Sequence, residues 1–268
     1  MKKHLIYIIG IAATLFTACE NIPESERFIA IDNPALSDTL SSEDSVTILR
    51  TVLLEDYTGQ RCSNCPNAHE QATALHNVYH DRLVVVSMHA GMMYFPNSTM
   101  KQPEGDEYAN KAGVVDYPSG VVNRRTAAMT VPSEWPTAIR EEMLRPTNVS
   151  LKVKTEIGQT GMNVVATAYS SENVSAKLQL WVLEDSIVDR QIMPDGSLNR
   201  NYVHNHVFRR TMNGTWGEDI SIVAGEETIK EITDFSLDNS WVIKNLSIVG
   251  IVYDDEGVIQ VSQCKVVQ

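Results

Sequence analysis

The fold of this chain is decided by residues 46–80, VTILRTVLLEDYTGQRCSNCPNAHEQATALHNVYH. The first part, residues 46–57, is rich in β-branched and other apolar residues, which predicts a strand. A loop of four residues then leads to Cys62-Ser63-Asn64-Cys65, which opens a segment with helical spacing. Five apolar side chains of this segment share one face of the predicted helix: Ala68, Ala72, Leu75, Val78 and Tyr79. A strand, a short loop, a CxxC motif and a helix in this order are typical of a redox-active dithiol.

The cysteine pair has two main interpretations. At a helix N-terminus, the unpaired N–H groups and the helix dipole lower the pKa of a first cysteine, and a second cysteine one turn later resolves a mixed disulfide. Arg61 adds a positive charge beside Cys62. On this interpretation Cys62 is the reactive thiol and Cys65 the resolving one. The alternative is a structural disulfide that does not turn over.

A zinc site is a third interpretation of the same motif. Cys62 and Cys65 are followed by His76 and His80, a spacing close to that of a zinc finger, and His69 falls on the same helix face as Cys65. The spacing departs from a zinc finger by about two residues, and zinc fingers fold as small independent units. We therefore expect a polar helix face here, and neither a metal ion nor another cofactor.

The residues that follow predict an α/β domain over residues 46–146. The run Leu83–Met88 is continuously apolar, as expected of a strand covered on both faces. Helices are predicted over residues 104–112 and 133–144, with a short strand over residues 120–123 between them. The alternation of strands and helices indicates a layered α/β arrangement.

After Pro146 the pattern changes to short strands and turns, which predicts an antiparallel β-sandwich domain over residues 147–268. The predicted strands are residues 149–157, 163–169, 177–183, 246–253 and 258–267. His204 and His206 alternate, so on a strand they share one face, and with Arg209 and Arg210 they suggest a polar or metal-binding patch, or simply a polar sheet face. Other candidate residues are His89, at the end of a predicted strand and without an assigned role, and Cys264, expected to be a small buried apolar residue.

The N-terminal segment predicts export. Lys2 and Lys3 precede a mostly apolar run that is shorter than the roughly 20 residues of a spanning helix, so residues 1–18 are predicted to be a signal peptide. The run ends in Phe16-Thr17-Ala18-Cys19, which resembles a bacterial lipobox, and we expect Cys19 to carry the lipid that attaches the chain to a membrane. Residues 19–45 are acidic and rich in serine, which predicts an extended tether. A net charge of −12 argues against nucleic acid as a partner.

The segment from Val52 through Cys65 resembles the thioredoxin superfamily. The resemblance implies that Asp56 is a buried acid that assists proton transfer to the second cysteine, and that Pro118, in the segment VDYPS, is a cis-proline that contacts substrate. The sequence departs from the superfamily pattern at Arg61, which replaces a tryptophan, at Ser-Asn between the cysteines, and at an insertion over residues 92–103.

The chain also resembles the outer-membrane-protein-28-related bacterial lipoproteins. The shared features are the lipobox, the acidic tether and the segments EDYTGQRCSNCP, YPSGVVNR and NYVHNHVFRR. The resemblance implies an outer membrane lipoprotein, facing the periplasm or the cell surface, with a thioredoxin-like domain followed by a β-rich domain. Two functions are compatible with it. One is thiol–disulfide exchange with thiols or disulfides of envelope proteins. The other is an adhesin-like or surface-binding role for an unknown ligand, with a structural disulfide. The two functions differ in whether Cys62 is exposed and has a low pKa.

Overall fold

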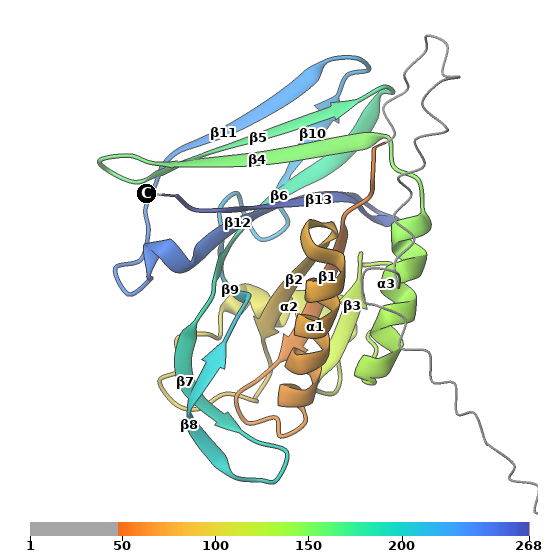
Figure 1. Ribbon diagram of the computed structural model, residues 1–268. Coiled ribbons are helices and arrows are strands. Elements are labelled where there is room, and N and C mark those ends of the chain that lie inside the picture. The colour runs from red at the N-terminus through yellow and green to blue at the C-terminus, as the bar shows by residue number, and fades with distance from the viewer. Residues whose placement is uncertain (1–47, 268) are drawn as a thin grey trace, which may run out of the picture. The chain divides into compact units, whose positions relative to one another are not determined.

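The computed structural model describes residues 48–267 (Figure 1). The predicted signal peptide, Cys19 and the tether lie outside the described residues. The fold is mostly β and contains sheets of eight, three and two strands. None of the helices in residues 48–267 is long and apolar enough to cross a membrane.

The first part of the fold alternates strands and helices in the predicted order. Strand β1 (Val52–Thr58) leads to helix α1 (Cys65–Tyr79), strand β2 (Leu83–His89), helix α2 (Pro103–Lys111), strand β3 (Ser119–Val122) and helix α3 (Trp135–Leu144). Every residue of β1 and β2 is buried, which explains why both strands are nearly continuous apolar runs. Strand β1 pairs parallel to β2 and antiparallel to β3. These elements confirm the predicted order of strands and helices, but β1 begins at Val52, six residues after the predicted start of the first strand.

Strands from both halves of the chain form one eight-stranded sheet. Its order is β13-β12-β6-β9-β2-β1-β3, with β10 paired to β6. The later strands are β6 (Val174–Glu184), β9 (Val207–Thr211), β10 (Glu218–Ile222), β12 (Leu246–Asp254) and β13 (Gly257–Lys265). Residue 146 therefore separates helix-rich from strand-rich sequence, but it does not divide the sheet, and the division into two domains stays a prediction.

A second sheet packs against the strand-rich end of the first. It has the order β11-β5-β4, formed by β4 (Val149–Ile157), β5 (Met162–Ser170) and β11 (Glu227–Phe235). Alternate residues of β5, such as Val164 and Ala166, join Leu180 and Ile248 of the large sheet in one apolar cluster. The two sheets enclose this apolar core.

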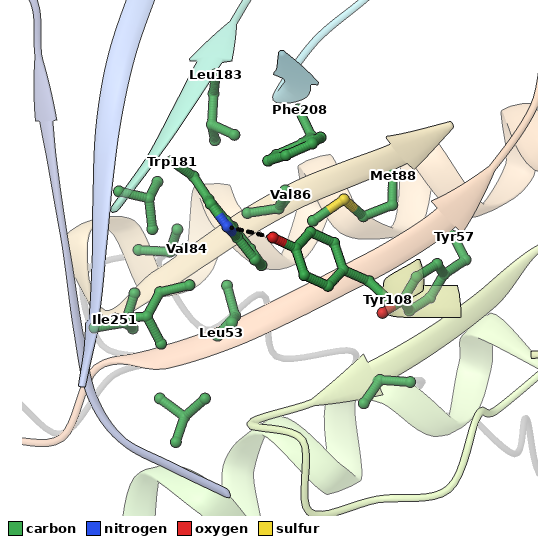
Figure 2. Close-up of a cluster of buried hydrophobic side chains, with 14 of the residues drawn as sticks. Leu53, Tyr57, Val84, Val86, Met88, Tyr108, Trp181, Leu183, Phe208 and Ile251 are labelled. Atoms are coloured by element: carbon green, nitrogen blue, oxygen red, sulfur yellow. Dashed lines mark hydrogen bonds between the residues drawn. The ribbon is translucent and has the colours of Figure 1, made fainter. Parts of the chain in front are cut away.

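A second apolar cluster joins the two halves of the chain. Tyr108 of α2 meets Trp181 of β6 with their ring centroids 5.1 Å apart, and the Tyr108 hydroxyl lies 3.2 Å from the Trp181 Nε1 (Figure 2). Leu53 of β1 and Ile251 of β12 belong to the same cluster. Because residues on both sides of position 146 share this core, neither side buries it alone.

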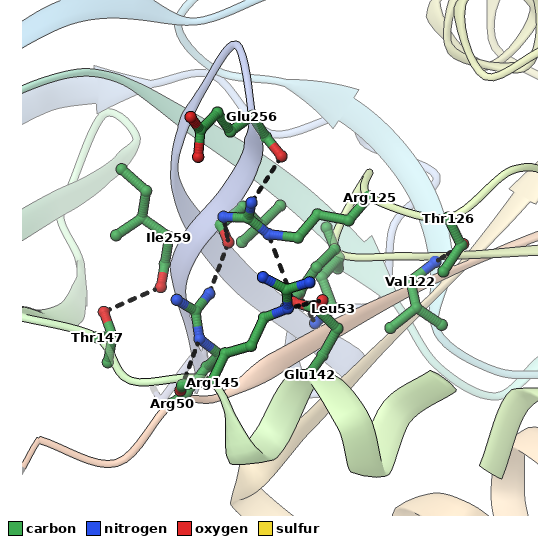
Figure 3. Close-up of polar contacts among 12 residues, drawn as sticks. Arg50, Leu53, Val122, Arg125, Thr126, Glu142, Arg145, Thr147, Glu256 and Ile259 are labelled. Atoms are coloured by element: carbon green, nitrogen blue, oxygen red, sulfur yellow. Dashed lines mark hydrogen bonds and ion pairs between the residues drawn. The ribbon is translucent and has the colours of Figure 1, made fainter. Parts of the chain in front are cut away.

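Polar contacts add to this connection near the end of α3. Arg50 is buried and donates to the carbonyl oxygens of Arg145, Pro146 and Val258 (Figure 3). Nearby, the Nε of Arg145 forms an ion pair with the carboxylate of Glu142 at 2.7 Å. The guanidinium of Arg50 thus links the segment before β1, the segment after α3 and strand β13.

The two remaining strands form a separate hairpin, β7 (Ile187–Ile192) and β8 (Leu198–His204). Its two ends are bounded by Ser186 and His206, which have positive φ angles of 62° and 57°. Non-glycine residues rarely adopt this conformation, so the chain bends sharply where the hairpin leaves the large sheet and where it returns.

Candidate functional site: the buried disulfide and its histidine cavity

Cys62 and Cys65 form a disulfide at the start of α1. The backbone N–H of Cys62 donates to the carbonyl oxygen of Gly59, which closes the short loop after β1. Pro66 occupies the first helical turn, where a missing N–H is tolerated. Cys65 is completely buried and Cys62 is only 5% exposed. Cys62 is thus the sulfur nearer to solvent, but neither cysteine is open to a large partner in this conformation.

Asp56 of β1 is fully buried, and neither of its carboxylate oxygens has a hydrogen-bond partner among the described residues. Burial raises the pKa of this carboxyl to about 8. The side chain is therefore mostly protonated at neutral pH. A buried carboxylic acid with a pKa near neutrality can both donate and accept a proton.

His69, one turn beyond Cys65 on α1, lies beside this acid. Its Nε2 is 3.8 Å from the Asp56 Oδ2 and 2.8 Å from the Thr58 hydroxyl, and its Nδ1 is 2.9 Å from the Tyr202 hydroxyl. Burial, followed by the neighbouring His204 and His206, lowers the pKa of His69 to about 3. His69 is therefore neutral, and its two nitrogens link β1 to the β7–β8 hairpin.

A cavity of about 320 Å³ lies between α1, the end of β2 and β8. Asp56, His69, His89, Tyr202 and His204 all line it. The rings of His89 and His204 have centroids 5.4 Å apart, and their ring nitrogens are buried without partners among the described residues. Burial lowers the pKa of His204 to about 4 and that of His89 well below its usual value, so both rings are neutral.

Metal binding is not supported at these residues. In the part of the chain that the structure describes, no three His, Cys, Asp or Glu side chains are arranged to hold a metal ion. The zinc interpretation also conflicts with the disulfide, which consumes Cys65, and with His76, whose Nδ1 is 3.0 Å from the carbonyl oxygen of Leu83.

The structure does not bring His204, His206, Arg209 and Arg210 together in one patch, because the four side chains contact different parts of the molecule. Strand β8 ends at His204, whose ring meets His89, while His206 meets His76 and Asp185. Arg209 is buried and pairs with Glu184, and Arg210 donates to the carbonyl oxygen of Ser236. The reversal of the backbone at His206 breaks the alternation on which the prediction depended.

The β7–β8 hairpin covers the loop that carries the disulfide. Gln191, fully buried, donates its side-chain amide to the carbonyl oxygen of Cys62 at 2.9 Å. The backbone N–H of Ile192 donates to the carbonyl oxygen of Gln60, and the Gln60 amide donates in return to Asp189. These bonds hold the hairpin across the entrance to Cys62.

The predicted insertion at residues 92–103 completes the cover. Met93 accepts a hydrogen bond from the backbone N–H of Arg61, and a side chain at Gly59 would collide with Met93. Arg190 of the hairpin packs on the ring of Phe95 at 4.7 Å and donates to the carbonyl oxygen of Pro96. The hairpin and the insertion therefore form one continuous cover over the disulfide loop.

Pro118 lies at the start of β3, and the Tyr117–Pro118 peptide bond is cis, as the resemblance to thioredoxins implied. Strand β3 pairs with β1 so that Gly120 lies opposite Asp56.

Cys264, the free cysteine among the described residues, is half-buried in β13 and away from this site. No local pattern in the sequence points to Gln191 or Tyr202, because their contacts with the site join residues more than a hundred positions apart.

Comparisons with known proteins place this geometry in context. The family described as outer membrane protein Omp28 matches residues 105–268. Among curated proteins, none matches the chain.

Several solved structures share the fold, among them the following two. HBP35 of Porphyromonas gingivalis is 16% identical, with a TM-score of 0.63 over 82% of this chain and 76% of that one. Protein AGR_C_4864 from Agrobacterium tumefaciens is 14% identical, with a TM-score of 0.52 over 82% of this chain and 96% of that one. At these identities the similarity is one of fold alone.

Proposed function

The chain belongs to the outer membrane protein Omp28 family, and on this premise we propose that it is an exported envelope lipoprotein that exchanges thiols and disulfides through Cys62 and Cys65. The family places it in the outer membrane or the cell envelope. In our proposal the helix-rich segment is a thioredoxin-like domain and the strand-rich segment a β-sandwich domain. Its substrates are thiols or disulfides of envelope proteins.

The observation that carries the proposal is the buried acid on the strand that leads to the disulfide. The carboxyl of Asp56 has no hydrogen-bond partner among the described residues, and its pKa is about 8. Burying a carboxyl without a partner destabilises a fold, so such groups concentrate at sites where a proton must be held and released. His69, one turn beyond Cys65, is 3.8 Å from this carboxyl.

In the proposed reaction, a substrate thiolate attacks the Sγ of Cys62 and the Cys62–Cys65 bond breaks. Cys65 leaves as a thiolate and takes up the proton that Asp56 holds. A second thiolate of the substrate then attacks the substrate sulfur of the mixed disulfide, and Cys62 leaves and takes a proton from water. The substrate dithiol becomes a disulfide, and its two electrons reduce the cysteine pair. The reverse sequence reduces a substrate disulfide. Pro118, at the start of β3, would shape the site where the substrate chain lies.

A second function is favoured by the burial of Cys62. With 5% of its surface exposed, Cys62 is inaccessible to a folded substrate unless the β7–β8 hairpin moves. If the hairpin stays in place, the disulfide is a staple that stabilises the loop after β1, and the protein binds a surface ligand without redox chemistry.

The reduction potential of the pair distinguishes the two functions. A potential of about −270 to −120 mV, with rapid alkylation of Cys62 after reduction, supports exchange. A potential below about −300 mV, with Cys62 unreactive, supports the staple. Cys264 is replaced by serine in all samples, so that the thiols measured are those of Cys62 and Cys65. Asp56→Asn is the matched variant, because it keeps the size of the side chain and removes the titrating proton.

The lipid anchor is tested separately at Cys19, which lies outside the described residues. Cells that make the full chain are labelled with a radioactive fatty acid. We expect the label on the natural sequence and its loss in Cys19→Ala, while Cys264→Ser keeps it. Labelling of Cys19→Ala would show that the lipid is attached elsewhere.

A further inference from the structure

A second and larger cavity, of about 880 Å³, lies on the opposite face of β1 from the disulfide site. Successive residues of a strand point to opposite faces, so Asp56 faces α1 while Glu55 and Tyr57 face this cavity. Its remaining lining comes from α2 and β3 on one side and from β6, β10 and β12 on the other. The size falls within the range of small-molecule sites, and a place between two parts of a fold is typical of them.

The floor of the cavity is a buried ion pair. Arg124 donates through Nε to the Glu55 carboxylate at 3.1 Å and through Nη2 to the Gln179 side chain at 2.7 Å. Its Nη1 has no partner among the described residues. A guanidinium has five N–H groups, and leaving one buried nitrogen unpaired costs free energy, so the floor offers a donor to an incoming acceptor.

The backbone that holds Arg124 is strained. Asn123 and Arg124 have positive φ angles of 48° and 54°, a conformation that non-glycine residues rarely adopt twice in succession. Such strain persists where the surrounding structure fixes it, and it gathers at binding sites. Asn123 is fixed by its side chain, which accepts from the N–H of Leu53 and donates to Glu142.

The walls of the cavity are aromatic. Tyr57 and Tyr108 lie in the apolar cluster that also contains Trp181 (Figure 2), and Trp216 and Tyr253 face them from the strand-rich part. The hydroxyls of Tyr108 and Tyr253 are already occupied by the carbonyl oxygens of Thr215 and Trp216. Because these hydroxyls are already paired, the aromatic walls favour a flat apolar body over a polar one.

The charge pattern selects among flat molecules. The guanidinium of Arg124 already covers the ring of Tyr253 at 4.6 Å, so this ring face is not free to stack on a second cation. At the rim, Lys177 is paired with Asp219, and Lys111 lies on α2. Asp254 and Asp255 also line the rim, at the end of β12 and in the turn after it. An acceptor oxygen directed at Arg124 is the complementary group.

We propose that this cavity binds a small molecule with an aromatic ring that carries an acceptor oxygen, either a carboxylate or a neutral carbonyl, with the ring between the aromatic walls and the oxygen toward Arg124. The site is independent of the disulfide and of the thiol exchange proposed above. Its ligand contacts both the helix-rich and the strand-rich parts of the chain, so binding stabilises the junction between them.

Three probes with one ring system test the proposal: indole-3-acetate, indole-3-acetamide and tryptamine. They carry a carboxylate, a neutral carbonyl and an ammonium group. Binding to the full chain is measured by saturation-transfer NMR and titration. We expect both acceptor-bearing probes to bind and tryptamine to bind at least about tenfold more weakly. If indole-3-acetate binds more tightly than indole-3-acetamide, the natural ligand carries a carboxylate. If the two bind equally, the natural ligand carries a neutral carbonyl.

Matched tryptophan variants locate the site. Trp216→Leu removes an aromatic wall, whereas Trp241→Leu removes a similarly half-buried ring that packs against the other apolar cluster. We expect the first to weaken binding about tenfold and the second to leave it within about twofold. Ser221→Trp, at an exposed position in the cavity lining, fills the mouth without disturbing the core and should also weaken binding.

Three results would overturn the proposal. One is the absence of binding by all three probes at about 1 mM, the weak end of specific affinity. Another is tryptamine binding as tightly as the acetate, since the floor then does not select an acceptor. The last is an equal loss of affinity in Trp216→Leu and Trp241→Leu, which would mean that the probes bind elsewhere.

Discussion

The side-chain amide of Gln191 donates a hydrogen bond to the carbonyl oxygen of Cys62, a residue 129 positions earlier in the chain. The bonds that hold the β7–β8 hairpin over the disulfide loop are mainly of this polar kind. On the outer side of the hairpin, Val188 and Val203 pair across the strands and are 60% and 48% exposed. A segment held by polar bonds with little apolar burial opens at a lower free energy than the core does. The hairpin is therefore the element whose opening would expose Cys62.

Removing that amide should make the disulfide easier to reach. In Gln191→Ala, the bonds to the carbonyl oxygens of Cys62 and Gly59 are lost. At about 1 kcal/mol for each, the opening equilibrium shifts by about thirtyfold. The rate at which dithiothreitol reduces the disulfide should rise by the same factor. This rate is measured by quenching samples with an alkylating agent and determining the mass of the alkylated protein by mass spectrometry.

Asn201→Ala is the control for this experiment, because Asn201 is exposed on the same hairpin. Its reduction rate should equal that of the natural sequence. An unchanged rate in Gln191→Ala would mean that opening of the hairpin does not limit access to Cys62.

The buried carboxyl of Asp56 makes stability fall as the pH rises. Its pKa is about 8 in the folded state, against an ordinary value of 3.8. Between these values the folded state binds a proton that the unfolded state releases, so the favourable contribution is complete below pH 3.8 and is lost as the pH rises through 8. At about 1.4 kcal/mol per pKa unit, the full difference is about 6 kcal/mol.

Asp56→Asn should remove this dependence. The free energies of unfolding of the variant and of the natural sequence should be most similar near pH 4. As the pH rises to about 9, the variant should become progressively more stable than the natural sequence. Urea unfolding of both proteins at several pH values, with the disulfide intact, measures the difference. A constant difference across the range would show that Asp56 ionises freely in the folded state.

The buried histidines have the opposite effect. The pKa values of His69 and His204 fall to about 3 and about 4, and that of His89 falls further below its usual value, in each case mainly because of burial. Below pH 6.5 the unfolded state binds protons at these positions and the folded state does not, so stability is complete above pH 6.5 and is lost as the pH falls. Three histidines outweigh the single opposing proton of Asp56 between about pH 6.5 and 4.

Unfolding of His89→Gln should take up one proton fewer than unfolding of the natural sequence. The slope of the free energy of unfolding against pH should therefore fall by about 1.4 kcal/mol per pH unit in this range. His80→Asn is the matched control, because His80 is exposed and asparagine tolerates its positive φ angle. Urea midpoints between pH 4.5 and pH 7.5 give both slopes. Equal slopes in His89→Gln and the natural sequence would show that His89 is protonated in the folded state.

Local patterns in the sequence predicted the elements that surround the disulfide. The apolar runs of β1 and β2 and the helical spacing after Cys62 depend on neighbouring residues, so they are visible without the fold. Strand β11 was missed because its apolar residues, Ile229, Ile232 and Phe235, do not alternate, and its register shifts between the last two. A bulge of this kind hides the period of a strand.

The candidate site was predicted in part for the same reason. Cys62, Cys65 and Asp56 lie within ten residues of one another, and their arrangement follows from one strand, one loop and one helix. Gln191, Tyr202 and His204 arrive from a hairpin that joins the site only through long-range packing. The sequence around them, polar and irregular, indicates a surface segment and contains no information on what it covers.

The Arg50 contacts bear on the two-domain division, because they join segments on both sides of residue 146. Arg50 donates to the carbonyl oxygens of Arg145, Pro146 and Val258, and Leu53 and Trp181 share one apolar cluster. We expect a single unfolding transition, with equal calorimetric and van't Hoff enthalpies. Two separated transitions would instead support independent domains with a boundary near residue 146.

Arg50→Met keeps the apolar stem of the side chain and removes all three bonds. Each carbonyl then loses a charged donor, and we expect the free energy of unfolding to fall by about 3 kcal/mol. The transition should remain single, because the eight-stranded sheet still contains strands from both segments. Arg140→Met, at an exposed position on α3, should change stability by less than about 0.5 kcal/mol. If Arg50→Met split the transition in two, the guanidinium itself would be the link that couples the two segments.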